Sequence, residues 1–380
     1  MNFHFNQDEQ DVLDMLHDFC LKEVAPIAAE IDETERFPEE TWHKLADMGM
    51  MGIAYPEEVG GAGMSYVTYI GACEELAKHC ATTSVMVSAH SSLCCWPISE
   101  YGTEAQKEKY LSKLCSGEWL GAFGLTEPGA GTDAAMQKTV AEDKGDHWVL
   151  NGSKIFITNA GFANVFVVFA MTDKSLGTKG ISAFIVERDF PGFKVGSHEK
   201  KMGIRGSSTC ELVFEDCIVP KENLLGEVGK GFKIAMTTLD GGRIGIGAQA
   251  LGIAQAAIDE CVKYTKERVQ FGKRISQFQN TQFQLADMQA KLDGARLLIY
   301  RAAQAKQDHE PYSHLAAMGK LMASEVASDV TRRALQLVGG YGYTREYPFE
   351  RFMRDAKITE IYEGTSEVQR MVISRALGVK

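Results

Sequence analysis

The sequence predicts an α+β protein in three consecutive parts, with helices first, strands second and helices again to the end. Two observations carry this prediction. Apolar residues recur at helical spacing before about residue 118 and again after residue 231, whereas short β-rich runs separated by Gly, Asp and Lys fill the part between. We expect an N-terminal helical domain at residues 1–119, a middle antiparallel β-barrel or sandwich at 120–226, and a C-terminal four-helix bundle at 227–380.

The N-terminal part is predicted to be a succession of amphipathic helices. Within residues 8–30, apolar side chains from Val12 to Val24 trace one helical face. Residues 38–49 have proline near the start and glycine at the end, which is the usual asymmetry of a short helix. Further helices are predicted over residues 65–79, 86–101 and 104–115.

The middle part carries the strand signals. Val149-Leu150 and Ile155-Phe156-Ile157 flank Asn151-Gly152, a dipeptide that suits the positive φ angles of a two-residue hairpin turn. The sequence therefore predicts a hairpin at this position. Additional strands are predicted over residues 165–170, 181–187 and 211–215.

In the C-terminal part the helical period returns over long segments. Short loops between long helices predict an antiparallel bundle. The expected helices are residues 246–268, 281–307 and 314–338.

Composition excludes several classes of protein. Hydrophobic residues make up 45% and charged residues 24% of the 380 residues, as in an ordinary globular protein. A net charge of −11 argues against binding to nucleic acid or to an anionic membrane. The first residues lack the pattern of a secretory signal, and the longest apolar run, near residues 165–171, is too short to span a bilayer. We expect no membrane insertion and a cytoplasmic location.

Neither cysteine nor histidine suggests a metal site. The nine cysteines include no C-x-x-C motif, and an odd, scattered set is typical of small core residues in a reducing compartment. The nine histidines form no H-E-x-x-H motif and no ligand-like pairing with cysteine. The sequence therefore predicts no bound metal.

One glycine motif suggests a nicotinamide cofactor, but its context does not. Residues Gly245 to Ala250 fit the loose G-x-G-x-x-G/A pattern, and Glu267 follows about twenty residues later. No strand precedes the motif, and a continuous helical stretch follows it. We interpret these glycines as positions where two helices pack closely, which disfavours a nicotinamide dehydrogenase.

Glu363 is the candidate general base. It lies in a turn before a predicted helix, where Ser366 and Gln369 have the spacing of a capping box. Gly364 lets a ligand approach the backbone, and the side chain of Tyr362 helps to exclude water. Loss of water raises the pKa of a carboxylate toward the range of a general base. A single glutamate in a turn is more often an exposed surface residue, so the neighbouring motifs have to support this role.

Four further segments could bind a flat heterocycle or an anion. The loop Gly124 to Asp133 offers backbone N–H groups and threonine hydroxyls, although such residues also dominate ordinary turns. Thr158 lies beside Phe156 at a strand end. Asp240 to Arg243 combines a cation with two glycines, and Gln336 to Gly342 exposes backbone at three glycines. Each signal is weak alone, and their joint presence is stronger.

Two of these segments resemble the signatures of the acyl-CoA dehydrogenase family. Leu125-Thr-Glu-Pro-Gly-Ala-Gly-Thr-Asp133 matches the first, and Gln336-x-x-Gly339-Gly340-x-Gly342-Tyr343-x-x-Glu346 matches the second. The chain is similar to the family over essentially its whole length, and most similar to bacterial short-chain, butyryl-CoA members. The resemblance implies bound FAD, a homotetramer built as a dimer of dimers, and an electron-transfer flavoprotein as redox partner.

The resemblance also assigns residues to roles. Glu363 corresponds to the base that removes the α-proton of the acyl thioester, and the β-hydride passes to FAD. The implied substrate-binding residues are Thr132, Asp240, Gly241, Gly242, Arg243, Tyr362 and Gly364. The implied FAD-binding residues are Phe123, Leu125, Thr126, Gly131, Thr132, Phe156, Ile157, Thr158, Thr365, Ser366 and Glu367, together with Arg268, Phe271, Gln279, Gln336, Leu337, Val338, Gly339 and Gly340, of which Arg268, Gln279 and residues 336–340 match positions that reach the FAD of a neighbouring subunit.

Butyryl-CoA dehydrogenation to the trans-2-enoyl thioester, reversible as a crotonyl-CoA reductase, is the expected reaction. Related members place their base where this chain has Gly242, so Glu363 favours the straight-chain arrangement. A glutaryl-CoA dehydrogenase is disfavoured because residues 86–100 contain no arginine for a distal carboxylate. Another short enoyl-CoA reductase remains an alternative, and a catalytically inactive scaffold is disfavoured by the presence of Glu363.

Overall fold

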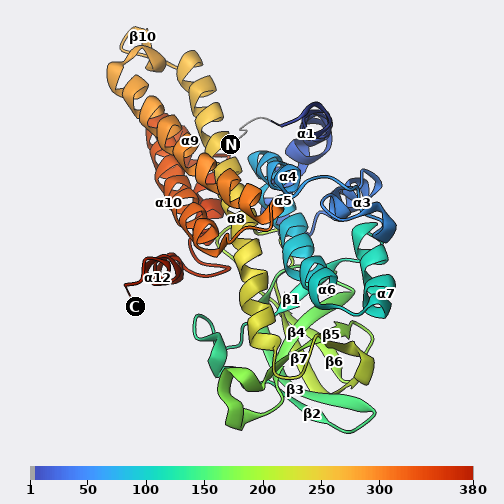
Figure 1. The fold of residues 1–380 in the computed structure, drawn as a ribbon. Coiled ribbons are helices and arrows are strands. Elements are labelled where there is room, and N and C mark those ends of the chain that lie inside the picture. The colour runs from blue at the N-terminus through green and yellow to red at the C-terminus, as the bar shows by residue number, and fades with distance from the viewer. Residues whose placement is uncertain (1–4, 380) are drawn as a thin grey trace.

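The computed structural model describes residues 5–379 and confirms the three-part α+β order (Figure 1). The sheet lies at the bottom of the view, the N-terminal helices lie beside and above it, and the C-terminal helices rise away from it. The long helix α8 starts at the sheet and continues through the bundle, so it connects all three parts.

The predicted N-terminal helices are confirmed, but two of them are interrupted. A π-helical turn at Cys20–Val24 and a 3-10 turn at Ala25–Ile27 divide the first, at the point where Pro26 cannot donate a backbone hydrogen bond. A second π-helical turn, His90–Cys95, precedes Pro97 in the same way. The α-helices are α1 (Gln7–Phe19), α2 (Ala28–Thr34), α3 (Glu39–Asp47), α4 (Tyr66–His79), α5 (Ala81–Ala89), α6 (Trp96–Tyr101) and α7 (Glu104–Cys115).

The middle part is a β-domain whose sheet is mixed. Its strands run in the order β6-β7-β3-β2-β4-β5-β8, with β1 beside β4. The prediction of an antiparallel domain holds for most pairs, but β1 and β2 each pair with β4 in parallel. The strands are β1 (Gly121–Gly124), β2 (Val140–Asp143), β3 (His147–Ile157), β4 (Val165–Met171), β5 (Ile181–Glu187), β6 (Phe193–His198), β7 (Cys210–Pro220) and β8 (Leu224–Leu225).

The hairpin predicted at Asn151-Gly152 is wrong. Strand β3 runs through both residues, and Gly152, with φ +144°, lies at a register shift in the pairing of β3 with β7. The turn lies earlier, where the Lys144 N–H donates to the His147 carbonyl at 3.0 Å. A glycine with positive φ serves a bulge as well as a turn, and the dipeptide alone does not distinguish them.

Strand β4 is buried on both faces and anchors the sheet to the helices. Val165, Val167 and Phe169 belong to a core shared with α6, α7 and α8, while Phe166 and Val168 point into the core of the other face. This alternation follows from the two-residue period of a strand. The sheet is therefore held directly under the helical parts.

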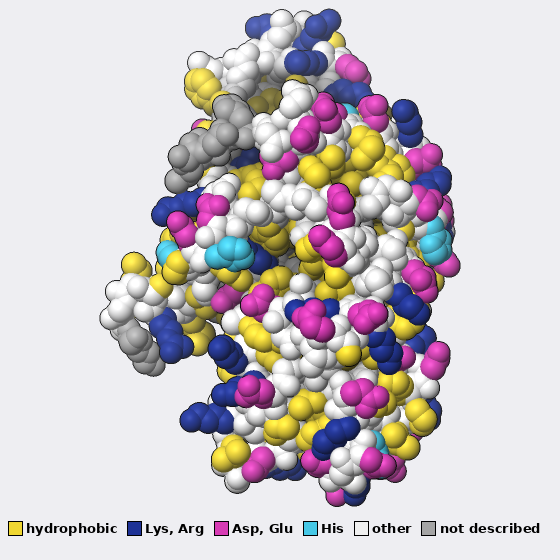
Figure 2. Space-filling view, turned by 45° about the vertical axis from the view of Figure 1, so that its right-hand side comes forward, with side chains coloured by type: hydrophobic (Ala, Val, Ile, Leu, Met, Phe, Trp, Pro, Cys, Tyr) yellow, Lys and Arg dark blue, Asp and Glu magenta, His cyan; other side chains and the backbone are white. Residues whose placement is uncertain are grey.

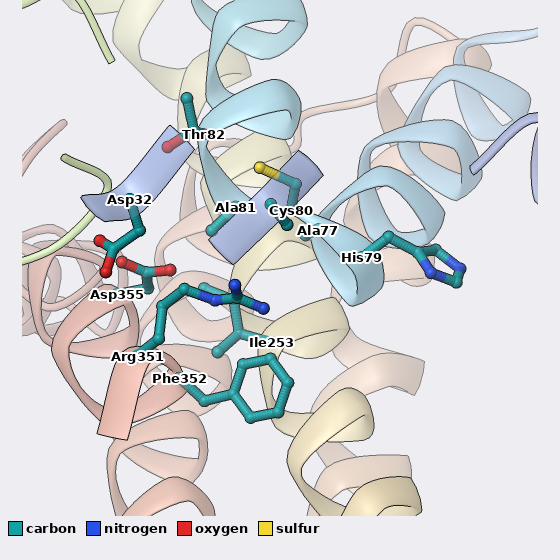
Figure 3. Close-up of a pocket in the computed structure, with 11 residues that line it drawn as sticks. Asp32, Ala77, His79, Cys80, Ala81, Thr82, Ile253, Arg351, Phe352 and Asp355 are labelled. Carbon is teal, nitrogen blue, oxygen red and sulfur yellow. The ribbon is translucent and has the colours of Figure 1, made fainter. Parts of the chain in front are cut away.

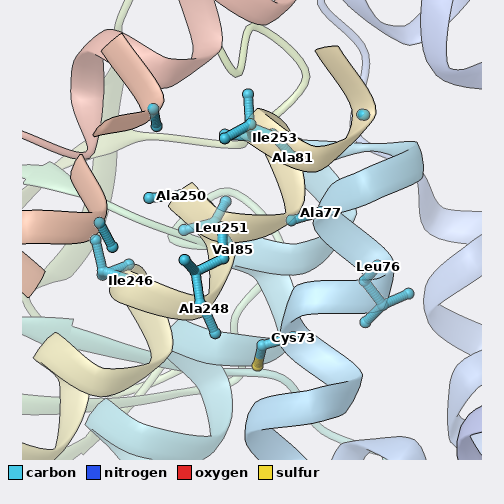
Figure 4. Packing of buried hydrophobic residues seen from close by; sticks show 14 of the residues in the cluster. Cys73, Leu76, Ala77, Ala81, Val85, Ile246, Ala248, Ala250, Leu251 and Ile253 are labelled. Carbon is cyan, nitrogen blue, oxygen red and sulfur yellow. The ribbon is translucent and has the colours of Figure 1, made fainter. Parts of the chain in front are cut away.

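The C-terminal part consists of three long helices and two shorter ones among the described residues. Its long helices pack closely where glycines lie: a Cβ on Gly247 would be 2.0 Å from Ile299 Cδ1 on α9, and one on Gly252 would be 2.2 Å from the Glu74 carbonyl on α4. The dinucleotide-like motif is thus helical packing, as predicted (Figure 4). The helices are α8 (Gly231–Glu267), α9 (Gln279–Gln307), α10 (Ser313–Val338), α11 (Phe349–Ile358) and α12 (Ser366–Ala376), and a hairpin of β9 (Val269–Gln270) and β10 (Lys273–Arg274) joins α8 to α9.

Two predictions from composition can be compared with the structure. All nine cysteines are unpaired and buried, which confirms their role as core residues. Within residues 5–379, no helix combines the length and the apolar character needed to cross a bilayer.

An ion pair ties the C-terminal part to the N-terminal part. Arg354 of α11 donates two hydrogen bonds to Asp32 of α2, at 2.9 and 2.6 Å, and also binds Glu350. Close by, Arg351, Asp355 and Asp32 line a cavity of about 10 Å³, which holds about one water molecule at most (Figure 3). Burial raises the pKa of Asp355 to about 6, and the carboxylate accepts the Ile204 N–H at 2.5 Å. This junction is structural.

We expect Arg354→Met to lower the stability of the folded chain by about 3–5 kcal/mol, because it leaves the mostly buried Asp32 carboxylate without its counter-charge. Arg345→Met is a matched control, since Arg345 pairs with Glu33 between the same two regions, but its side chain is 64% exposed and that of Glu33 59%. The control should lose at most about 1 kcal/mol. Thermal unfolding of both variants measures the difference, and equal losses would contradict this interpretation.

Candidate active site

Glu363 lies in the turn between α11 and α12, in a left-handed backbone conformation. Its φ angle is +51°, and that of the following Gly364 is +97°. A residue with a Cβ pays about 1–2 kcal/mol for this conformation, so neighbouring contacts must hold the turn. The position predicted from the sequence, just before a helix, is correct.

Two buried side chains hold the turn from opposite sides. The Gly364 carbonyl accepts hydrogen bonds from Lys320 Nζ of α10 at 2.6 Å and from Gln369 Nε2 of α12 at 2.8 Å. Both side chains are fully buried. The predicted capping box is displaced by one residue: Thr365 caps α12, and Gln369 instead supports the turn. The sequence did not identify Lys320, whose helical position looks like any other.

The Glu363 carboxylate is desolvated and unpaired. The residue is half-buried overall, but its Oε2 atom is buried and has no hydrogen-bond partner among the described residues. Burial raises the pKa of Glu363 to about 7, although the Lys320 and Arg243 cations oppose this rise. A carboxylate with such a pKa can both accept and release a proton near neutral pH.

Gly242 provides the space into which this carboxylate points. A Cβ at Gly242 would lie 2.1 Å from Glu363 Oε2 and 2.8 Å from Leu93 Cδ2, so a larger residue at 242 would collide with the base. The structure thus brings the predicted segment Asp240 to Arg243 against Glu363. Arg243 is buried and paired with Asp240, while its Nε atom has no partner among the described residues.

Two further contacts surround the same wall. The predicted Tyr362 hydroxyl donates to Gln249 Oε1 on α8. On the other side, Tyr66 of α4 donates to the Gly241 carbonyl at 3.1 Å. The wall made by Gly241 and Gly242 is therefore fixed from the N-terminal domain as well as from the bundle.

Lys306 is a cation near this wall that sequence reasoning missed. Its Nζ atom is buried without a hydrogen-bond partner among the described residues, and burial lowers its pKa to about 7. It lies 4.1 Å from the ring centre of Tyr66 and 4.9 Å from that of Trp96. A Cβ on Gly241 would be 2.5 Å from Nζ. Lys306 belongs to α9, more than two hundred residues after Trp96, so no local sequence pattern could predict that it lies beside this wall.

The loop at residues 125–133 is held by a buried ion pair that was also missed. Lys154 Nζ donates to Glu127 Oε1 at 2.7 Å, to Gln137 Oε1 at 3.0 Å and to the Leu125 carbonyl at 3.2 Å. Burial alone would raise the pKa of Glu127, but Lys154 and the Lys138 N–H keep it below its usual value. The pair therefore stays ionised and fixes the start of the loop.

The same network brings the loop beside the end of β3. The Ile155 N–H donates to the Thr126 carbonyl at 2.9 Å. Phe156 is 59% exposed and has φ +59°, so its ring is presented outward although it belongs to a strand. The other residues predicted to bind FAD here belong to the same loop and strand ends. They are Phe123, Leu125, Thr126, Gly131, Thr132, Ile157 and Thr158.

Exposed backbone and unpartnered polar atoms at these segments fit a large polar ligand. A Cβ at Gly129 or Gly131 would meet no atom within 4 Å. Ser366, at the start of α12, has a buried Oγ atom without a partner among the described residues. Thr365 and Glu367 flank it. Accessible backbone and free hydroxyl groups of this kind can contact a phosphate or a flat ring.

The remaining predicted cofactor residues lie elsewhere. Arg268 is at the end of α8, 5.4 Å from the ring of Tyr341, next to the segment Gln336, Leu337, Val338, Gly339 and Gly340. Phe271, in the adjacent hairpin, is 93% exposed, and Gln279 starts α9. Figure 1 shows this hairpin at the opposite end of the molecule from the sheet. Within one chain they do not meet the loop at 125–133.

Comparison with known proteins gives one family over the whole chain. The model described as "Acyl-CoA dehydrogenase, N-terminal domain" matches residues 6–118. The middle-domain model of that family matches residues 122–217, and the C-terminal-domain model matches residues 229–378.

Individual relatives agree with the family models. The short-chain specific acyl-CoA dehydrogenase of Clostridium acetobutylicum is 60% identical over 374 residues, which cover 98% of this chain and 99% of the relative. The structure of butyryl-CoA dehydrogenase from Megasphaera elsdenii is 54% identical, with a TM-score of 0.98 over 99% of this chain and 100% of that one. A chain from work on the electron transferring flavoprotein of Acidaminococcus fermentans and flavin-based electron bifurcation is 55% identical, with a TM-score of 0.98 over 99% of both chains.

Proposed function

This chain belongs to the acyl-CoA dehydrogenase family, and on that premise we propose that it oxidises short-chain acyl-CoA thioesters, with butyryl-CoA preferred. It is a flavin-dependent oxidoreductase that converts the Cα–Cβ bond of the acyl group to a trans double bond. The observation that carries the proposal is the buried, unpaired Glu363 Oε2 atom facing Gly242. The 60% identity to a short-chain specific enzyme supports the chain-length preference.

In this proposal Glu363 removes the α-proton of the thioester. The Cα–H bond breaks, the proton goes to the carboxylate, and the electron pair is delocalised onto the carbonyl oxygen. The Glu363 N–H has no hydrogen-bond acceptor within residues 5–379, so it is free to donate to that oxygen as charge develops. In this proposal the left-handed turn lets the N–H and the carboxylate of one residue serve the same ligand.

We propose that FAD occupies the cradle formed by the loop at 125–133, the exposed Phe156 ring and the start of α12. Thr126, Thr132 and Ser366 offer hydroxyl groups, and Gly129 and Gly131 leave the backbone accessible. Bound FAD supplies the hydride acceptor that no amino-acid side chain can provide. Phe156 would stack on a flat ring, which accounts for an aromatic side chain held outward at positive φ.

We further propose that the remaining predicted cofactor residues, which lie around Arg268, contact the FAD of a neighbouring subunit. The hairpin that follows Arg268 lies at the opposite end of the molecule from the sheet (Figure 1), and Phe271 in this hairpin is almost fully exposed. Phe271, Tyr341 and Tyr343 are all exposed, and several exposed aromatic side chains close together are typical of an interface between proteins. A homotetramer built as a dimer of dimers would bring this surface to the FAD site of another chain. With domain boundaries at residues 119/120 and 226/227, the middle domain of one chain and the C-terminal domain of another would then share one FAD.

An electron-transfer flavoprotein is the proposed redox partner, and the reaction can run in either direction. The similarity to a chain from work on electron transferring flavoprotein supports this partner. The nine unpaired cysteines support a reducing, cytoplasmic compartment.

We expect anaerobic butyryl-CoA to bleach the visible flavin band of the purified protein, and we expect Glu363→Gln to slow this bleaching by at least about a hundredfold, because the general base is lost. The variant should still bind the thioester, since Gln keeps the shape of Glu. Stopped-flow absorbance measures the rates. Slower bleaching by longer acyl-CoA thioesters and by glutaryl-CoA is expected, and bleaching by Glu363→Gln at the wild-type rate would refute the assigned role.

We expect kcat/KM to rise about tenfold per pH unit below pH 7 and to level off above it, because only the deprotonated Glu363 accepts a proton and its pKa is about 7. Lys320→Met removes a cation that favours the carboxylate, so the midpoint should move upward by ~1 unit. Lys357→Met is the control, since Lys357 is exposed and pairs with Glu360. An unchanged midpoint in Lys320→Met would show that Lys320 only holds the turn.

We expect Arg268→Ala to weaken FAD retention by roughly tenfold or more, which corresponds to losing one hydrogen bond from a charged donor. The same variant should weaken the tetramer. Lys266→Ala, an exposed cation two residues earlier on α8, should change neither property. Fluorescence of released flavin and analytical ultracentrifugation measure the two effects. Normal FAD retention in a stable tetramer would argue against a cross-subunit contact.

A further inference from the structure

Three side chains outside the active site form a compact group between α1 and α4. His17 Nδ1 is 2.6 Å from Glu75 Oε1, and His79 Nε2 is 2.9 Å from the same oxygen. One atom from each of the three residues lies within 4.8 Å of the other two. Neither the oxidation chemistry nor the proposed FAD cradle uses this group.

The two helices position the group firmly. Glu75 and His79 are one helical turn apart on α4, so their side chains leave the same face of the helix. His17 lies in the last turn of α1, which packs on α4. Figure 3 shows His79 pointing away from the nearby Asp32, Arg351 and Asp355, so the imidazole is directed outward and away from that cluster. On the same part of α4, Glu74 is paired with Arg296 at 2.8 Å and Lys78 is paired with Asp259 at 3.2 Å, so neither neighbour competes for the group.

Two imidazoles and a carboxylate are a usual ligand set for a zinc-class cation. Zinc binds histidine nitrogen and glutamate oxygen at about 2.0–2.2 Å, and three protein ligands leave one position for water or another molecule. Ligand atoms around a tetrahedral zinc ion lie roughly 3.3 Å apart. The two nitrogens lie 2.6 and 2.9 Å from Glu75 Oε1, and no two of the three ligand atoms are more than 4.8 Å apart. To admit a cation the imidazoles would move away from Glu75 by less than about 1 Å, and the side chain of His17, which is 43% exposed, has room to do so.

A cavity beside the group provides access. It measures about 630 Å³, and His17 and Glu75 form part of its lining together with Glu74, Gln255 and Arg296. A cation between the three side chains would therefore be reachable from solvent, and its fourth position could hold water. Helical spacing on α4 joins Glu75 to His79, and the packing of α1 on α4 adds His17, which is 58 residues from Glu75 in the sequence.

We propose that His17, Glu75 and His79 bind one divalent zinc-class cation per chain, which fastens the N-terminal helix α1 to α4. The ion plays no part in the oxidation chemistry. Its effect is on the stability of the N-terminal domain, because a ligand that binds only the folded state raises the free energy of unfolding.

Isothermal titration of metal-stripped, tag-free holoenzyme with zinc chloride tests this site. We expect one equivalent to bind with micromolar or tighter affinity and to raise the thermal unfolding temperature. His17→Gln and His79→Gln should each weaken binding by at least about tenfold, since loss of even an outer partner of a metal ligand costs about 10- to 100-fold. The side chain of His17 is 43% exposed and that of His79 10% exposed, and both hydrogen-bond to Glu75 and not to a residue assigned to the thioester or to FAD, so the variants should retain flavin and activity.

The matched control is His43→Gln. His43 lies one helical turn after Glu39 on α3, and its Nε2 atom is 3.9 Å from the Glu39 carboxylate. This pair repeats the spacing of Glu75 and His79, but it has no third metal-ligating side chain beside it among the described residues. This variant should bind zinc like the wild type. Absence of saturable binding, or equal affinity in the His17→Gln and His79→Gln variants, would overturn the proposal and leave two histidines that simply hydrogen-bond to Glu75.

Discussion

The burial of one unpaired carboxylate is the constraint on which the site depends. An isolated charge inside a protein is costly, and the Glu363 pKa of about 7 is the measure of that cost. Neighbouring residues limit the penalty without removing it. Lys320 donates to the Gly364 carbonyl and not to the carboxylate, so its charge acts on Glu363 while the carboxylate oxygen stays free. A direct ion pair would have lowered the pKa of the carboxylate and occupied the oxygen that has to accept the proton.

The same constraint explains why helices of both the N-terminal and the C-terminal part converge on this turn. Gly242 of α8 leaves the space, Lys320 of α10 and Gln369 of α12 hold the backbone, and Tyr66 of α4 fixes the neighbouring wall. The middle domain contributes a separate surface whose loop is fixed by the Lys154–Glu127 pair. Buried pairs of this kind add little net stability compared with apolar packing, but they define one geometry for a loop rich in glycine.

Local patterns gave the fold order, the helical segments and the position of Glu363, because each depends on residues a few positions apart. The same patterns failed where a local signal has two outcomes, as at Gly152, which forms a bulge and not a hairpin turn. They also could not reveal Lys306, Lys320 or Lys154, which act across long stretches of sequence. The sequence around a lysine does not show whether its side chain is buried, because burial depends on elements that pack against it from elsewhere in the chain. Lys154 and Lys320 are fully buried, and so is the Nζ atom of Lys306.

The exposed side chains near Arg268 bear on the proposed assembly of chains. A soluble surface normally carries few large aromatic residues, yet Phe271 is 93% and Tyr343 82% exposed near the Arg268 end of the bundle. The cradle at the sheet is likewise open, since Gly129 and Gly131 face no neighbouring atom. The tetramer proposed above would bring the Arg268 surface of one chain against the loop at 125–133 of another. In that proposal the two surfaces hold one cofactor together, so assembly is a condition for binding it and not a later addition to a finished site.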